Sequence, residues 1–258
     1  MSRPELALTV LGSGDAFATA GRPYSSYLLE PLGDPGGGAR AVLMDCGPTA
    51  VPMLMGMGFD MGRLDLILLS HLHGDHVLGM PFVFLDSQFR TKRDRPLVVA
   101  GPPGTEAKCE ALFRLAYRDT LEHMGRRFEV RYRELPEGEE SEVCGLRITP
   151  RKVVHQREEI PYGYRIAWRG RTIGWSGDTQ WDGALVELAR DADLFIVECF
   201  TAGFQLRYHT SAEDLEREKH RLTARRTLLT HMGETTLRRL AEGKLPFEAA
   251  RDGQRIEL

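Results

Sequence analysis

The feature that most constrains this chain is an apolar segment that leads directly into a cluster of histidines. Residues 64–70 read LDLILLS, and the six residues that follow read HLHGDH. A near-continuous apolar segment of this length is typical of a strand that is buried on both faces, as in the parallel sheets of α/β proteins. The cluster therefore follows a buried strand, where α/β sheets commonly carry their functional groups.

Four side chains of this cluster are of the types that bind metal ions: His71, His73, Asp75 and His76. In an extended segment His71 and His73 point the same way, because side chains repeat every second residue. Gly74 lets the backbone turn, so that the last two donors can reach a second point nearby. Imidazole and carboxylate groups suit zinc, and also iron or manganese. A solvated surface turn is the alternative, but so dense a cluster is rare without chemistry.

Three further donors follow apolar segments later in the chain. His155 follows RKVV, Asp178 follows TIGWSG and His231 follows RTLLT. Taken alone, each is as consistent with a structural residue as with a ligand. Together with the first cluster, they predict one site at which the ends of several strands meet.

The order of expected elements predicts an α/β fold built as a four-layer α/β/β/α sandwich. Hairpins mix with strand–helix alternation in both halves, which implies two sheets packed face to face with helices outside. We expect a single domain over residues 1–258 and one long amphipathic helix over 104–124. Loops are expected at 31–39 and 134–145, and an edge strand in the tail, 247–258.

Composition excludes several classes of protein. The formal charge of −3 gives no sign of a surface for gripping long nucleic acids. The four cysteines form no C-x-x-C pair, so neither a zinc knuckle nor a redox dithiol is expected. No apolar segment approaches the roughly 20 residues that span a bilayer, and the N-terminus lacks the features of a signal peptide. We expect a cytoplasmic protein that does not interact with membranes.

The order H-x-H-x-D-H, then His, Asp and His, resembles the metallo-β-lactamase superfamily. LGSGDAF and LMDCG, near the start of the chain, also resemble the opening strands of that superfamily. The resemblance covers nearly the whole chain and implies two divalent ions that activate water for hydrolysis. We expect zinc, with manganese or iron as alternatives. The resemblance implies that one ion is held by His71, His73 and His155 and the other by Asp75, His76 and His231, with Asp178 bridging both.

Two further features narrow the branch of the superfamily. An aspartate at the bridging position resembles the phosphodiesterase, glyoxalase II and lactonase branches, whereas the β-lactamases proper have a cysteine there. The segment YHTSAEDL resembles a ribonuclease Z element whose histidine contacts the scissile phosphate, which implies a catalytic role for His209. The alternative is a loop residue before an N-cap at Ser211. Asp75 is expected to share in proton handling besides its ligand role.

Bacterial ribonuclease Z enzymes carry a long arm that grips tRNA, inserted between the ligands that match His155 and Asp178. Here only the 22 residues 156–177 separate them, so the chain resembles the armless branch that includes the cyclic-phosphate phosphodiesterases. We therefore expect a phosphodiesterase that acts on small phosphodiesters as a homodimer, with tRNA a poor substrate. An arylsulfatase or lactonase is the alternative. Arg22, with Ser25 and Ser26, is a further candidate for binding a phosphate or sulfate oxygen, and a plain surface arginine is the alternative.

Overall fold

The computed structural model of the chain describes residues 4–33, 40–157 and 159–258. These residues form two sheets of seven strands each. The first sheet has the order β14-β1-β2-β3-β4-β5-β6, and the second has the order β13-β12-β11-β10-β9-β8-β7. Strands β3 to β6 are parallel to one another in the first sheet, as are β10 to β13 in the second.

The strands of the first sheet are β1 (Leu6–Gly12), β2 (Ser26–Pro31), β3 (Ala41–Met44), β4 (Leu64–Leu68), β5 (Leu97–Gly101), β6 (Val130–Glu134) and β14 (Arg255–Glu257). Those of the second are β7 (Ser141–Val143), β8 (Leu146–Lys152), β9 (Tyr162–Trp168), β10 (Arg171–Trp175), β11 (Leu194–Glu198), β12 (Thr227–Thr230) and β13 (Glu248–Ala249). The α-helices are α1 (Ala50–Gly56), α2 (Gly74–Val77), α3 (Met80–Leu85), α4 (Thr105–Ala116), α5 (Arg118–Met124), α6 (Gly183–Ala189), α7 (Ala212–Glu218) and α8 (Glu234–Ala241).

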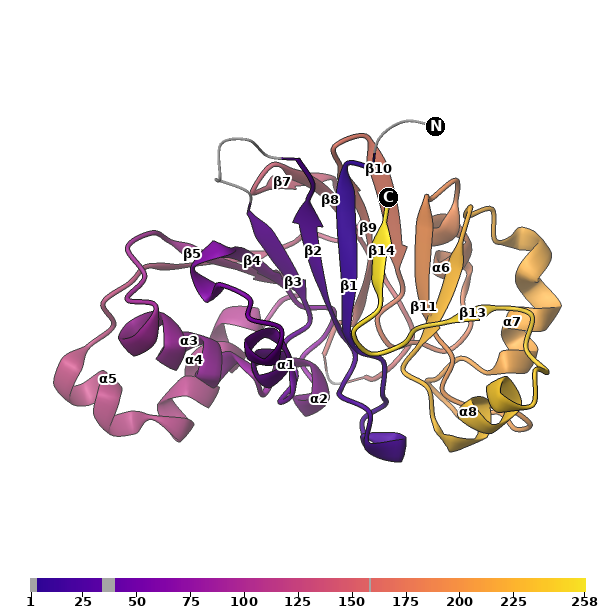
Figure 1. Cartoon of the computed structure of the whole chain (residues 1–258), viewed down its shortest axis with the longest axis horizontal. Helices are drawn as coiled ribbons and strands as arrows, with labels where there is room; N and C mark the ends of the chain where they lie inside the picture. Colours follow the sequence, from indigo (N-terminus) through magenta and orange to yellow (C-terminus); the bar gives the residue numbers. More distant parts are fainter. Residues whose placement is uncertain (1–3, 34–39, 158) are drawn as a thin grey trace.

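The predicted four-layer sandwich is confirmed. In Figure 1 the two sheets stand together at the centre, with α3, α4 and α5 on one side and α6, α7 and α8 on the other. Strand β4 is buried along its whole length because both of its faces are covered. Leu66 and Leu68 pack in the core between the sheets, while Ile67 packs with Phe84 of α3 and Phe113 of α4. This alternation is the two-residue period of a strand.

The expectation of one long helix over residues 104–124 is wrong, because two helices meet there at Tyr117. This residue leaves the helical region, with φ −138° and ψ 51°. Its ring stays beside Phe113, with 5.8 Å between the ring centroids. The apolar spacing continues across the break, so the pattern gave no sign of it.

The expected loop over residues 134–145 is also partly wrong, because it contains β7. This short strand pairs with β8 through a tight turn at Cys144 and Gly145, which have φ values of 50° and 78°. Two positive φ values in succession are typical of the turns that join hairpin strands. The charged composition of the segment hid the strand. Of the loop expected at 31–39, residues 34–39 lie outside the described part of the chain.

The expected edge strand in the tail is confirmed, and the tail in fact supplies one edge strand to each sheet. Strand β13 pairs with β12 of the second sheet, and β14 pairs with β1 of the first. Within the described residues, no helix has both the length and the apolar character that crossing a membrane requires.

Candidate metal centre

The predicted donors come together where strands of both sheets end. His71 and His73 follow β4, and α2 carries Asp75 and His76. From the second sheet, His155 follows β8, Asp178 follows β10 and His231 follows β12. Each donor thus lies in the loop that follows a strand or, for Asp75 and His76, in the short helix after that loop.

One glycine lets the loops of the two sheets touch. Gly177 has a φ of +57°, and a Cβ atom there would lie 2.8 Å from the Tyr162 carbonyl oxygen and 3.0 Å from the Ser70 Cβ. The backbone N–H of Tyr162 donates to the Ser70 carbonyl over 2.9 Å. Since Ser70 precedes His71 and Gly177 precedes Asp178, this contact brings the two halves of the site together.

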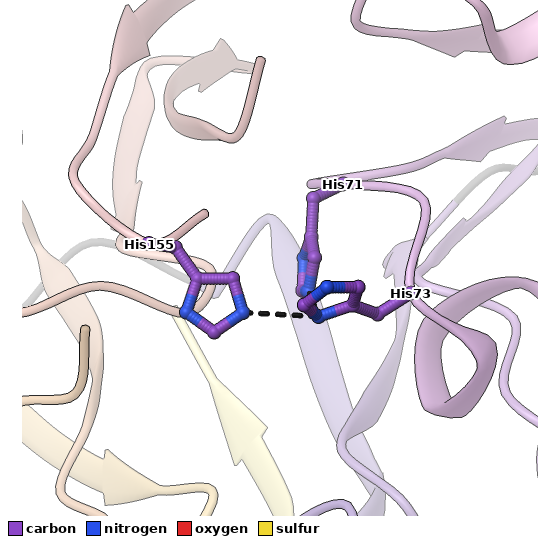
Figure 2. Close-up of side chains that lie close together, drawn as sticks. All are labelled: His71, His73 and His155. Carbon is purple, nitrogen blue, oxygen red and sulfur yellow. Dashed lines mark hydrogen bonds between the residues drawn. The ribbon is translucent and has the colours of Figure 1, made fainter. Parts of the chain in front are cut away.

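Three histidines form the first group of donors, and Figure 2 shows their rings pointing toward one another. His73 Nδ1 lies 3.2 Å from His71 Nε2 and 3.0 Å from His155 Nε2. Two nitrogens bound to one tetrahedral zinc ion at the usual bond length lie about 3.3 Å apart. The spacing of the three nitrogens therefore fits a shared metal ion.

Hydrogen bonds on the far side of two of these rings direct their lone pairs toward the centre of the group. His155 Nδ1 lies 2.9 Å from the Tyr208 carbonyl oxygen, and His71 Nδ1 lies 3.0 Å from the Ser70 hydroxyl. A ring that donates from Nδ1 carries a lone pair on Nε2 when it is neutral. Burial lowers the pKa of His155 to about 4 and that of His71 well below its usual range, so both rings stay neutral. Lone pairs that face each other in this way favour a cation between them.

The second group consists of Asp75, His76, Asp178 and His231. Asp178 Oδ2 lies 3.3 Å from His76 Nε2 and 3.0 Å from His231 Nε2. The same oxygen is 3.9 Å from His71 Nε2, so Asp178 lies between the two groups. Asp75 Oδ2 faces the same pair of rings, 3.0 Å from His76 Nε2 and 3.4 Å from His231 Nε2.

The charges of the second group favour a bound cation. Burial raises the pKa of Asp178, but the neighbouring His231 and His76 rings outweigh burial and hold that pKa well below its usual range. Burial lowers the pKa of His76, and Asp75 and Asp178 outweigh this and raise it. His76 Nε2 is buried and makes no hydrogen bond of good geometry within the described structure. Ionised carboxylates beside buried imidazole nitrogens are a donor set that suits a divalent cation.

A buried carboxylate that the sequence reasoning did not single out orients both groups. Asp45 Oδ2 lies 2.5 Å from His76 Nδ1 and accepts a 2.8 Å bond from the Ser70 hydroxyl, which in turn contacts His71. Its other oxygen accepts from the Ser70 N–H over 2.8 Å. Carboxylates commonly hold metal-binding histidines in this way, fixing tautomer and ring orientation. Asp45 lies in the LMDCG segment, and its position after an apolar strand was the available signal.

His209 lies beside both groups and is held by a second unpredicted acid. Its Nδ1 is 3.2 Å from each oxygen of Glu198, a fully buried residue at the end of β11. The ring centroid of His209 is 5.0 Å from that of His155 and 5.7 Å from that of His231. Burial lowers the pKa of His209, but Glu198 outweighs it and raises that pKa to about 9. An acid that ends the apolar segment DLFIVE was the signal for Glu198.

The structure brings together all seven predicted donors and His209, and it shows which partners the predicted oxygen-binding group around Arg22 has. Arg22 donates to the Ser13 hydroxyl and lies 4.0 Å from Asp252. The Ser25 hydroxyl donates to the Gly14 carbonyl, and that of Ser26 to the Tyr24 carbonyl. Among the described residues, Arg22 thus contacts a neighbouring serine and the C-terminal tail, and the Ser25 hydroxyl also lies 3.3 Å from that of Thr230. Binding of a substrate oxygen by Arg22 stays a prediction from the sequence.

Comparison with known proteins places the chain among metallo-hydrolases. It is 26% identical to the ribonuclease Z of Geobacillus kaustophilus (strain HTA426), over 94% of each chain. It is 32% identical to the uncharacterized protein ML1173 of Mycobacterium leprae (strain TN), over 93% of this chain and 83% of the relative. Among solved structures, a new diphosphatase from the PhnP family superimposes with a TM-score of 0.77 at 21% identity, covering 98% of both chains.

A match to a family model identifies the family of the chain more specifically than these pairwise similarities do. The model of the anti-Pycsar protein Apyc1 matches residues 6–251, which include every donor described above and both acids that orient them. The resemblance to ribonuclease Z-like members of the metallo-β-lactamase superfamily is likewise confirmed. The chain belongs to the family of the anti-Pycsar protein Apyc1 and is a ribonuclease Z-like member of the metallo-β-lactamase superfamily.

Proposed function

We propose that this protein is a metal-dependent phosphodiesterase that hydrolyses small phosphodiesters at the site between the two sheets. The observation that carries the proposal is the convergence of seven donors in two adjacent groups, with Asp178 Oδ2 within 3.9 Å of a nitrogen from each. Relatives named ribonuclease Z and the likeness to a diphosphatase support a reaction at phosphorus.

Two divalent ions fit these groups, and we propose zinc, with manganese or iron as alternatives. His71, His73 and His155 would hold one ion, Asp75, His76 and His231 the other, and Asp178 would contact both. Bound ions of this kind activate water and stabilise negative charge on the attacked phosphoryl group. Asp45 and Ser70 keep the ring nitrogens of His71 and His76 aimed at these positions.

His209 is proposed to act on the phosphate rather than to bind an ion. Its Nδ1 faces Glu198, so a proton on the other ring nitrogen is available to a phosphoryl oxygen or to the leaving group. Glu198 is a positioning residue, because it orients the ring and stabilises its positive charge without reaching the substrate. Asp75 is exposed enough to share in proton transfer near the ions, since it is the half-buried member of its group.

The substrate is proposed to be small. Within residues 156–177, the described positions hold β9, β10 and the turn between them, which leaves little chain for a tRNA-gripping arm. We also propose a homodimer, for which exposed apolar side chains such as Leu78 and Phe82 are candidates to be covered. A cytoplasmic location stays a prediction from the sequence.

The test is a panel of aryl substrates on protein whose metal content has been measured. Bis(p-nitrophenyl) phosphate should be cleaved faster than p-nitrophenyl phosphate, because the monoester carries an additional negative charge. Replacing His73 with Ala should abolish this turnover, and replacing the exposed His123 with Ala should not change it. Preferential turnover of p-nitrophenyl sulfate or of a lactone would contradict the proposal and favour the alternative activity.

A further inference from the structure

A strained loop lies against the metal centre without contributing a donor to it. Residues 13–22 connect β1 to the segment before β2, and Gly14 forms a bridge with Met232, next to His231. The Met232 N–H also donates to the Ser13 carbonyl over 3.3 Å. The loop is thus attached to the strand end that supplies one of the candidate ligands.

A buried carboxylate fixes the shape of this loop. Asp15 is 1% exposed and accepts bonds from the N–H of Phe17 at 3.2 Å, the N–H of Thr19 at 2.9 Å and the Thr19 hydroxyl at 2.7 Å. Ala18 and Ala20 are held in the left-handed region, with φ values of 51° and 58°. Residues other than glycine keep this conformation only where the surroundings impose it, and such positions cluster at functional sites.

The loop presents an exposed aromatic ring beside the proposed acid. Phe17 is 78% exposed, although large apolar side chains are usually covered. Its ring centroid lies 6.3 Å from that of Phe200, which in turn lies 4.6 Å from His209 and 5.8 Å from His231. The two phenylalanines therefore extend outward from the side of the centre where His209 stands.

We propose that Phe17 and Phe200 form an aromatic wall that binds a planar aromatic group carried by the substrate. This inference rests on the proposed function, because it requires a phosphoryl group held beside His209. An ester substituent on that phosphoryl group then leaves the centre past Phe200 and reaches Phe17. Two aromatic rings in contact stabilise each other by more than the area they bury accounts for.

The test compares two phosphonates that differ only in the presence of a ring. Phenylphosphonate and methylphosphonate share one head group and have no ester bond to hydrolyse, so their binding to the metal-loaded protein can be measured by titration calorimetry. The unmodified protein should bind phenylphosphonate about three- to tenfold more tightly. Phe17→Ala should remove this preference and leave methylphosphonate binding unchanged, and Phe17→Trp should retain it. Phe89→Ala, at an exposed phenylalanine shortly after α3, is the matched control and should keep the preference.

Three results would contradict the proposal that Phe17 and Phe200 bind an aromatic group. The first is a preference that survives Phe17→Ala, and the second is an equal loss of affinity for both phosphonates in that variant. The third is a particle mass in light scattering that differs between the Phe17→Ala variant and the unmodified protein, because Phe17 would then be a contact with a second copy of the chain. Failure of the proposed function is read separately, because it would be the absence of bis(p-nitrophenyl) phosphate turnover in the unmodified protein.

Discussion

At the scale of single residues, Asp178 and His209 have different relations to the two groups of donors. Asp178 is buried between the groups and faces nitrogens of both, whereas His209 stands beside both and turns one nitrogen to Glu198. Replacing Asp178 is therefore expected to affect metal binding, and replacing His209 is expected to affect the rate of the reaction. Substitutions can separate these roles because neither side chain contributes to the apolar core clusters.

Replacing Asp178 with Ala is expected to lower the occupancy of both metal positions, because one carboxylate oxygen faces both groups. Elemental analysis of the purified variant should find well under two ions per chain. His73→Ala is the comparison, since His73 belongs only to the first group and its loss should affect mainly one ion. An Asp178→Ala protein that keeps two ions per chain would contradict the bridging position.

Replacing His209 with Ala should leave the metal content and the fold nearly intact and lower kcat by roughly 10² to 10⁴, the usual cost of losing one acid–base or oxyanion-stabilising group. Replacing His231 should instead lower metal occupancy together with activity. Metal content and kcat must be measured on the same preparations. Full phosphodiesterase activity in the His209 variant would reduce this residue to a loop histidine.

At the scale of elements, the sequence predicted the features that depend on local patterns and missed those that depend on contacts between distant residues. The strand at Leu64–Leu68 follows from its apolar run, and the seven donors follow from their places after strands. The break at Tyr117 was missed because a helix can end without changing the apolar spacing around it. Asp45 and Glu198 were missed as orienting acids because their partners are distant in sequence, 31 and 11 residues away, and only the fold brings them together.

The contact between the loops after β4 and β10 depends on Gly177, and this gives a prediction for an element boundary. Gly177→Ala should lower the free energy of unfolding by about 1–3 kcal/mol, because its φ of +57° and the nearby Tyr162 carbonyl leave no room for a Cβ atom. That corresponds to about 2–4 °C in Tm for each kcal/mol. Metal content should fall as well, since the contact aligns Asp178 with His71.

The matched control for this variant is Gly183→Ala. Gly183 is an exposed residue at the start of α6, and a Cβ atom there would meet nothing within 4 Å. Its free energy of unfolding should change by no more than about 0.5 kcal/mol, as for a neutral surface substitution, which is about 1–2 °C in Tm. Equal Tm values for the two variants would mean that the Gly177 contact does not hold the loops together.

At the scale of the whole molecule, the site exists only where the two sheets are packed together. His71 and His73 come from the first sheet, while His155, Asp178 and His231 come from the second. Each donor group therefore combines residues of both sheets, and the site cannot form in either half alone. The same packing leaves the surface around the site as the remaining determinant of which phosphodiesters are accepted.

The chain as a whole lacks the excess of positive charge that binding of long nucleic acids usually requires, so tRNA is expected to bind weakly. The chain has 34 Lys and Arg against 37 Asp and Glu, and binding to a polyanion comes mainly from cations that displace its counterions. Filter binding of precursor tRNA at 150 mM salt should give a Kd of about 1 µM or weaker. Raising the salt from 50 to 200 mM should weaken binding far less than the 10³-fold loss typical of proteins with many phosphate contacts. The protein used must cleave bis(p-nitrophenyl) phosphate, so that weak binding cannot be blamed on an inactive preparation. Tight binding with a steep salt dependence would show that another surface takes the place of the arm.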